Sequence, residues 1–497
     1  MKRKSVLRSD FFSLRLLLGI VTFSGGLFVA LFATANQQPL TRDQTGHPNP
    51  QMFGPNPVPF GPSLSVRQEW VAPYTGIFDD EAVAIAVDRS GNVYVTGFSS
   101  IPDYSAYVTI KYNARGQELW TAAYADPNSI NFATAIAVDN SGNVYVTGES
   151  GTFDSGNDDY ATIKYNSAGE EQWVARYDGP ASDNDGATAI AVDDSGNVYV
   201  TGSSRSSGTD VDYATIKYDS SGQEQWVARY NGPGNGGDDA VAIAVDNSHN
   251  VYVTGFSFGA GTSQDYATIK YDSSGQQQWV ARYNGSGNGF DEATAIAIDG
   301  LGDVYVTGGS PGSGGTAEYA TIKYNAAGQE QWVARYNGPG TGSNGASAIG
   351  LDGAGNVYVT GSSFGSNGTY DYATIKYNGA GLEQWVSRYN GPGDLDDFAI
   401  AMTVNSSGDV YVTGESSGDY ATIKYNSSGQ EEWVARYNGP ENFDDYATAI
   451  AVDRSGNVYV TGATHQSDVY YDYDFATIKY TQPRPLPTPM PRPTLPR

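Results

Sequence analysis

The feature that most constrains this chain is an eightfold repeat with a period near 50 residues. Eight tryptophans mark it, at successive spacings of 50, 53, 53, 53, 53, 53 and 48 residues. The phrase SGNVYVTG stands unchanged at 90–97, 141–148, 195–202 and 455–462, and in variant form at 248–255, 301–308, 354–361 and 407–414. A self-similar period of this length is typical of a solenoid or a β-propeller.

Each repeat contains four short sequence motifs, here called words, that are rich in Val, Ile, Tyr, Thr and Trp, such as ATAIAVD, NVYVTG, YATIKY and EQWVARY. Words of this composition, bounded by Gly, Asn, Asp and Ser, predict β-strands. No stretch of the array shows the apolar spacing of about 3.6 residues that marks an amphipathic helix. Four strands per repeat predict an all-β propeller, whose strands we call inner, second, third and outer in the order just given.

The order of the words predicts how the ring closes. The array begins with an outer-type strand at 66–74 and ends with a third-type strand at 475–480, beyond which there is no further Trp. Pairing the first strand with the last would complete the eighth blade and leave no open sheet edge between the ends. We therefore expect an eight-bladed propeller of four-stranded antiparallel blades over residues 66–480, closed by its N-terminal strand.

Three segments lie outside the predicted ring. Residues 1–35 combine a basic start with an apolar run and the small-residue site Ala33-Thr34-Ala35, and they predict a cleaved signal peptide. Residues 36–65 read as a Pro/Asn-rich linker, and residues 481–497 as a Pro-rich tail. No later stretch is apolar enough to span a bilayer, so we expect no stable membrane insertion after cleavage. The expected location is secreted or at the cell surface, with the periplasm as an alternative.

The repeated words resemble a known family. D-x-S-G-N-V-Y-V-T-G followed by D-Y-A-T-I-K-Y resembles the bacterial SBBP propeller repeat over about 66–480. The fragment AVDxSGNVYV is similar to NHL repeats, and YNSSGQEQW is similar to the Gly-x-x-x-Trp docking motif of quinoprotein-type propellers. The resemblance implies a propeller in an exported bacterial protein, with each Trp packed between blades, and it implies no particular reaction.

Composition narrows the classes of partner. The formal charge is −27, and removal of residues 1–35 would make it −31. Such a surface excludes nucleic acid and anionic lipid as partners, because both are bound through basic side chains. There is no cysteine, so thiol catalysis and cysteine-based metal sites are excluded. We expect a monomer that binds an extracellular glycan or protein.

Tryptophan and lysine each recur once per repeat, and we interpret both as structural. We expect all eight tryptophans to lie in the core. One lysine recurs in each third strand, and we expect these lysines to pair with acids such as Glu171 and Glu224 of the outer strand or Asp193 and Asp246 of the inner strand, because a lone buried charge is costly. The lysines are Lys111, Lys164, Lys217, Lys270, Lys323, Lys376, Lys424 and Lys479.

Carboxylates recur before the inner and third strands, where the connections of a propeller share one face. Carboxylate and carbonyl oxygens are ligands for Ca²⁺, so calcium is a candidate, although no EF-hand spacing is present and no cofactor is required. Loop capping and solubility are the alternative explanation of these acids. His249 replaces a turn glycine, which we read as a local conformational cost rather than a functional site.

The repeat is broken in the loops between second and third strands of the last two units. The seventh has the short loop 415–419, and the eighth has the longest loop, 463–474. A unique site should lie where identical units differ, and clustered tyrosines suit sugar or protein ligands. Untuned drift of a terminal repeat is the alternative explanation of this loop. The candidate binding residues are His465, Tyr470, Tyr471, Asp472 and Tyr473.

The sequence offers no catalytic constellation. Its three histidines are His47, His249 and His465, and they form no plausible triad or three-His metal site. We therefore expect a non-catalytic binding or structural module. The alternative is an enzyme with its active site at the channel mouth, of the quinoprotein or polysaccharide-lyase kind, which would need unlike polar residues pointing toward the axis.

Overall fold

The computed structural model describes residues 66–76, 78–101, 104–125, 129–152, 157–208, 210–466 and 472–482. The chain divides into two units, Met1–Ser65 and Val66–Arg497, and everything described lies in the second. The predicted signal peptide and linker fall outside the described residues, as does all of the predicted tail beyond residue 482. Within the described part, no helix is long and apolar enough to cross a membrane.

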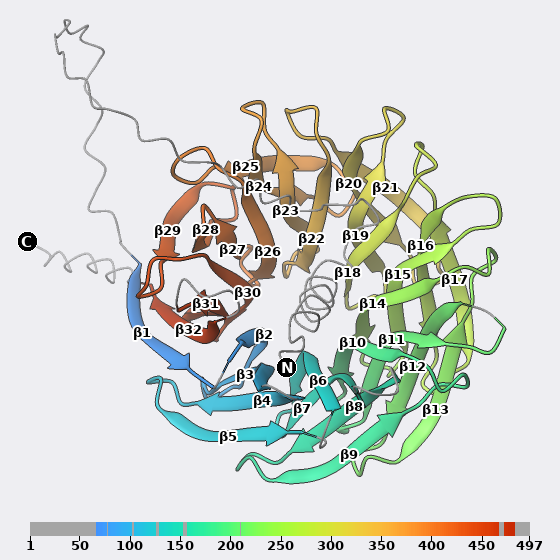
Figure 1. Cartoon of the computed structure of the whole chain (residues 1–497). Helices are drawn as coiled ribbons and strands as arrows, with labels where there is room; N and C mark the ends of the chain where they lie inside the picture. Colours follow the sequence, from blue (N-terminus) through green and yellow to red (C-terminus); the bar gives the residue numbers. More distant parts are fainter. Residues whose placement is uncertain are drawn as a thin grey trace, which may run out of the picture. The chain divides into compact units, whose positions relative to one another are not determined.

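The second unit is a ring of eight four-stranded antiparallel sheets (Figure 1). The inner strands are β2 (Asp80–Val87), β6 (Ser129–Val138), β10 (Asp185–Val192), β14 (Asp238–Val245), β18 (Glu292–Ile298), β22 (Asn344–Leu351), β26 (Asp397–Val404) and β30 (Asp445–Val452). The second strands are β3 (Val93–Ile101), β7 (Val144–Thr152), β11 (Val198–Arg205), β15 (Val251–Phe258), β19 (Val304–Pro311), β23 (Val357–Phe364), β27 (Val410–Ser416) and β31 (Val458–His465).

The remaining strands lie toward the outside of each blade. The third strands are β4 (Tyr104–Tyr112), β8 (Asp158–Tyr165), β12 (Val211–Tyr218), β16 (Gln264–Tyr271), β20 (Ala317–Tyr324), β24 (Tyr370–Tyr377), β28 (Asp419–Tyr425) and β32 (Tyr473–Thr481). The outer strands are β5 (Glu118–Tyr124), β9 (Glu171–Tyr177), β13 (Glu224–Tyr230), β17 (Gln277–Tyr283), β21 (Glu330–Tyr336), β25 (Glu383–Tyr389), β29 (Glu431–Tyr437) and β1 (Arg67–Tyr74). Blade 1 begins with β2, and blade 8 consists of β30, β31, β32 and β1.

The N-terminal strand closes the ring as predicted. β1 pairs antiparallel with β32, in a register that includes Trp70↔Lys479 and Tyr74↔Phe475. The inner strand β30 of this last blade packs in turn against β2 of blade 1. We call the boundary between blades 8 and 1 the seam. The chain crosses this boundary from β1 to β2, whereas the non-covalent closure of the ring lies within blade 8, where β1 pairs with β32.

Antiparallel pairing sorts the connections onto two faces. The turns from inner to second and from third to outer strands form one face, here called the turn face. The connections from second to third strands, and from one blade to the next, form the other, here called the loop face. On the turn face, Asp88 Oδ1 accepts hydrogen bonds from the backbone N–H groups of Ser90 and Asn92, which caps the first turn of blade 1 as the sequence predicts.

Each tryptophan packs against the next blade. The Trp120 indole N–H donates to the carbonyl of Ser167 at 3.2 Å, and its ring lies against Gly169. A Cβ on Gly169 would come within 2.6 Å of that ring, so only glycine allows the approach. Most of these rings are partly rather than fully buried, and Trp433, at the boundary between blades 7 and 8, is the buried one. The prediction of an inter-blade structural role is confirmed.

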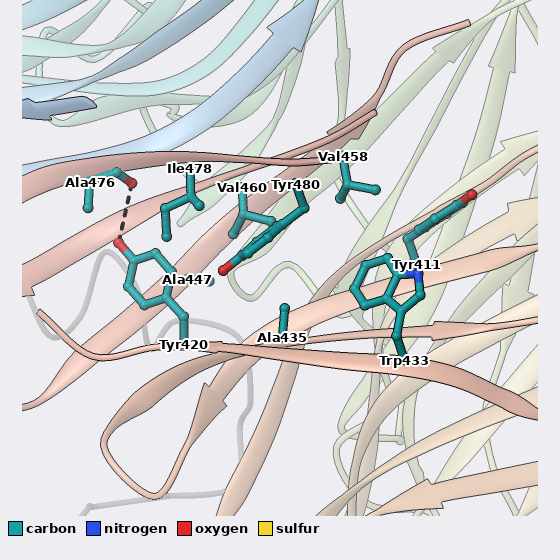
Figure 2. Close-up of a cluster of buried hydrophobic side chains, with 10 residues drawn as sticks. All are labelled: Tyr411, Tyr420, Trp433, Ala435, Ala447, Val458, Val460, Ala476, Ile478 and Tyr480. Carbon is teal, nitrogen blue, oxygen red and sulfur yellow. Dashed lines mark hydrogen bonds between the residues drawn. The ribbon is translucent and has the colours of Figure 1, made fainter. Parts of the chain in front are cut away.

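A hydrophobic cluster fills each boundary between blades. Figure 2 shows the cluster between blades 7 and 8, where Tyr420 and Trp433 of blade 7 face Val460, Ile478 and Tyr480 of blade 8. The Tyr420 hydroxyl donates to the carbonyl of Ala476 at 3.5 Å, which joins a large buried ring to the neighbouring sheet. The core is therefore a circle of interfaces between blades, and each blade is stabilised by both neighbours.

The prediction that acids pair with all the repeated lysines is wrong. Each ammonium lies 5.0–5.7 Å from the centre of the tyrosine ring of the second strand, an ordinary cation–π arrangement. Most donate to a carbonyl of the next blade, as Lys111 does to Ser167 at 2.9 Å. Within the described residues, acid partners accompany only Lys323, Lys424 and Lys479.

Candidate functional site

An arginine in the outer strand organises the loop face of six blades. The Arg282 guanidinium donates to the Oγ and carbonyl of Ser257, each at 2.7 Å, and to Asp265 at 2.9 Å. It also reaches the hydroxyl of Tyr230 in the preceding blade at 2.9 Å. The same network surrounds Arg176, Arg229, Arg335, Arg388 and Arg436. One cation thus neutralises the carboxylate at the start of the third strand and joins two blades.

This arginine is absent on both sides of the seam. Arg282 pairs across the ladder with Ala267, and the corresponding pairs are Pro73 with Ala476 in blade 8 and Ala123 with Val108 in blade 1. Pro73 is tolerated because β1 is an outer strand with one free edge. The seam is therefore the one boundary where both flanking blades lack the cation.

Without the arginine, carboxylates at the seam rely on weaker donors. Asp474 occupies the place of Asp265, is 5% exposed, and accepts a hydrogen bond from the Thr75 hydroxyl at 2.7 Å. Burial raises the pKa of Asp474, and the charge of Asp472 raises it further. Across the seam, burial raises the pKa of Tyr74 in β1, and the charge of Asp80 raises it further, while Ser99 of blade 1 lowers it.

Three consecutive acids of blade 1 face this region. Burial raises the pKa of Asp79 and of Asp80 to about 6 each, and that of Glu81 to about 7. The Tyr446 hydroxyl of blade 8 donates to Glu81, while the charge of Asp79 opposes its ionisation. Oδ1 of Asp79 and Oε2 of Glu81 are buried without a hydrogen-bond partner in the described part of the chain. Within the described residues, these oxygens therefore have unused capacity to accept hydrogen bonds.

Aromatic side chains line the blade-8 side of the same region. The rings of His465 and Tyr473, which face each other across the β31–β32 ladder, are stacked with centroids 4.6 Å apart. Phe443 lies 5.3 Å from His465, and Tyr446 meets Tyr473 edge-on at 5.6 Å. Together they place flat apolar surface beside the carboxylates. We call Asp79, Asp80, Glu81, Phe443, Tyr446, His465, Asp472, Tyr473 and Asp474 the seam surface.

Blade 7 contributes a two-residue hairpin beside this surface. Ser417 and Gly418 have φ of 51° and 75°, as a type I′ turn requires. The Gly418 carbonyl accepts from the backbone N–H of Asp445 at 2.8 Å, which fixes the short hairpin against blade 8. Burial raises the pKa of Glu415 to about 7, and the charges of Asp444 and Asp397 add to the effect. The carboxylates of blades 7, 8 and 1 are thus continuous along the loop face.

The structure brings together part of the predicted site. His465, Asp472 and Tyr473 belong to the seam surface, whereas Tyr470 and Tyr471 lie outside the described residues. Sequence reasoning missed Asp79, Glu81 and Tyr446, because they come from other connections and only ring closure places them beside the loop. The sequence did contain a sign of this site, because the repeated arginine of the VARY motif is lost in VAPY at 71–74 and in TAAY at 121–124.

The groups of residues that are close enough to share a metal ion lie outside the seam surface. Among described residues, three candidate ligand atoms lie within 4.8 Å of one another in two groups, Asp193–Asp194–His249 and Asp159–Asp178–Asp185. In the second group, Arg176 already neutralises Asp159 at 3.0 Å. Neither group of described residues therefore places a preformed calcium cage at the seam.

Comparisons with known proteins agree with the fold. Sqt1 from Chaetomium thermophilum has a TM-score of 0.53 and 10% identity, over 84% of this chain and 100% of that chain, which shows the fold alone. The polysaccharide lyase Uly1 has a TM-score of 0.43 and 11% identity, over 83% of this chain and 99% of that chain. A protein of unknown function from Dyadobacter fermentans has a TM-score of 0.39 and 9% identity, over 85% and 100%. No protein with a curated description matches the chain.

The repeat itself is recognised directly. The model of the SBBP β-propeller repeat matches residues 119–152, 172–208 and 432–468, each of which runs from an outer strand through an inner strand into a second strand. The first two matches are consecutive repeats, the third lies near the end of the array, and the blades between them share the same motifs and ladder registers. The chain is therefore an eight-bladed β-propeller that contains SBBP repeats.

Proposed function

We propose that this protein is an exported, non-catalytic binding module whose seam surface takes an arginine or lysine side chain of a partner polypeptide. One observation carries the proposal. Six blades fill the space between a Ser, an acid and the preceding Tyr with their own guanidinium, whereas blade 8 keeps the acid, Asp474, without an arginine. A ligand cation would make the contacts that the repeat makes internally elsewhere.

The chemistry of the surface supports a cation with a flat face. Charge-assisted hydrogen bonds to desolvated carboxylates are roughly twice as strong as neutral ones, and Asp474 and Glu81 are both buried. A guanidinium also stacks on aromatic faces, and the His465–Tyr473 pair provides one. The formal charge of −27 would speed the approach of a basic segment. Location outside the cytoplasm rests on the predicted signal peptide alone.

The test restores the arginine of the repeat. In Pro73→Arg, the new guanidinium should reach Asp474 as Arg282 reaches Asp265, so the fold is kept and the ligand position is filled. The probe is a short arginine peptide, with the uncharged citrulline peptide as its counterpart, measured by calorimetry. Pro73→Arg should weaken binding of the arginine peptide at least tenfold, about 1.4 kcal/mol. The citrulline peptide should bind wild type at least tenfold more weakly than the arginine peptide.

A matched control separates a specific site from general attraction. Asn247→Arg adds the same charge on the turn face, at a turn position where blades 1 and 8 already carry Arg89 and Arg454. This variant should bind the arginine peptide within about twofold of wild type, because one charge in a total of −27 hardly changes the overall field. Equal loss in both variants, or no loss in either, would refute the assignment of the site to the seam.

Other occupants are outcomes of the same experiment. A glycan panel on wild type and Pro73→Arg shows whether the tyrosines select sugars instead, in which case a neutral glycan binds and the arginine peptide does not. Turnover of a bound glycan would favour the enzymatic alternative. Calcium stays a prediction for the loop face, and identical melting curves in chelator and in millimolar calcium would remove it.

A further inference from the structure

Two departures from the repeat meet on the turn face, away from the seam. The first-turn glycine has φ between 77° and 84° in seven blades, and in blade 4 its place is taken by His249 at φ 61°. The residue two positions before that glycine is acidic only in blade 3, where it is Asp194. Its counterparts elsewhere are Arg89, Asn140, Asn247, Gly300, Gly353, Ser406 and Arg454. The unique histidine and the unique acid come from neighbouring blades and face each other.

Their distances suit a shared ion. Nδ1 of His249 lies 2.8 Å from Oδ2 of Asp193, and Nε2 lies 3.9 Å from Oδ1 of Asp194. One ligand atom from each of the three residues falls within 4.8 Å of the others. The Asp193 side chain is 3% exposed and the Asp194 side chain is 82% exposed. The inner carboxylate is fixed, and the outer one is free to adjust.

The inner carboxylate is held in place behind the histidine. Asp193 Oδ2 accepts from the Asn197 amide at 2.7 Å and from the Tyr199 hydroxyl at 3.0 Å. It lies 2.8 Å from Nδ1 of His249, a close approach without the angle of a hydrogen bond. The other ring nitrogen, Nε2, faces Asp194. Carboxylates beside the second ring nitrogen commonly orient metal-ligating histidines.

We propose that His249 Nε2 and the Asp194 carboxylate bind a divalent first-row transition metal ion, with Zn²⁺ as the representative, and that Asp193 orients the imidazole. Tetrahedral Zn²⁺ with bonds of about 2.0–2.2 Å needs ligand atoms roughly 3.3–3.5 Å apart. The present 3.9 Å closes by a small rotation of the exposed Asp194 side chain. Water completes the coordination. A nitrogen ligand favours Zn²⁺ over Ca²⁺, which prefers oxygen alone.

The repeat supplies variants that remove each ligand without disturbing the turn. His249→Gly restores the residue of the other seven blades, and Asp194→Asn introduces the residue of blades 2 and 4. Wild-type protein should bind about one equivalent of Zn²⁺ by calorimetry at neutral pH. Each variant should bind at least tenfold more weakly, with an unchanged circular dichroism spectrum.

A second histidine variant fixes the location. His465→Ala removes the other described histidine, on the loop face, and should leave Zn²⁺ affinity within about twofold of wild type. The proposal is overturned if wild type takes up no Zn²⁺, if both His249→Gly and Asp194→Asn bind it as wild type does, or if His465→Ala abolishes the uptake. In the first case, the approach of His249 to Asp193 is only an electrostatic contact between blades.

Discussion

Glu81 offers a direct test of the electrostatics of the seam. Its side chain is 4% exposed, and its pKa is raised from 4.5 to about 7, first by burial and then by the charge of Asp79, against the hydrogen bond from Tyr446. A pKa difference of one corresponds to about 1.4 kcal/mol. Ionised Glu81 therefore costs the folded state about 3 kcal/mol relative to the unfolded chain.

The pH window follows from these values. Between about pH 4.5 and 7 the folded protein holds a proton on Glu81 that the unfolded chain has lost, so the free energy of unfolding falls as the pH rises through this window. Gln keeps the shape and the acceptor for Tyr446 but does not ionise. Glu81→Gln should therefore raise the free energy of unfolding by about 2–3 kcal/mol at pH 8 and by less than about 1 kcal/mol at pH 4.5.

Urea denaturation followed by tryptophan fluorescence at the two pH values measures this difference. Glu171→Gln, in an exposed position of an outer strand, is the matched control and should change stability by less than about 0.5 kcal/mol at either pH. The reasoning fails if Glu81→Gln is destabilising by the same amount at pH 4.5 and pH 8, because Glu81 would then be a satisfied anion in the folded state.

Two further predictions concern the ring. Deletion of 66–74 exposes the β32 edge and removes Trp70 from the seam, so the protein should aggregate or lose most of its cooperative melting transition, whereas a melting temperature within a degree or two of wild type would contradict the observed closure. Trp279→Ala should cost about 3 kcal/mol in urea denaturation, because the ring packs on Gly328 and donates to the carbonyl of Ala326 at 3.2 Å, and a cost below about 1 kcal/mol would be too small for a structural contact between blades.

The fold was predictable because the same pattern of strands and turns recurs eight times in the sequence. Strand words, capped turns and the offset between the first and last words together determine the blades and their closure. The role of the lysines was not predictable, because a positional pattern shows that Lys111 needs a partner without showing that a carbonyl of the next blade provides it. Contacts between blades are not encoded in the spacing of one blade.

The candidate site was predictable only where it departs visibly from the repeat. The long loop identified His465 and Tyr473, but Glu81 and Tyr446 resemble ordinary members of their strands. Glu81 and Tyr446 matter because the repeated arginine is missing beside them. The replacement of that arginine by Pro73 and Ala123 can be recognised only after the contacts of Arg282 are known. His249 was correctly expected at positive φ, but its contact with Asp193 joins two blades and could not be derived from one turn.

The most direct test of the proposed function locates the bound cation. An arginine peptide with a photoreactive group beside the arginine is irradiated with the wild-type protein, and the cross-linked residues are mapped by mass spectrometry. The account predicts cross-links concentrated on the seam surface, at Phe443, His465 and Tyr473, and their loss in Pro73→Arg. Cross-links spread evenly over the eight blades, or concentrated on the turn face, would contradict it.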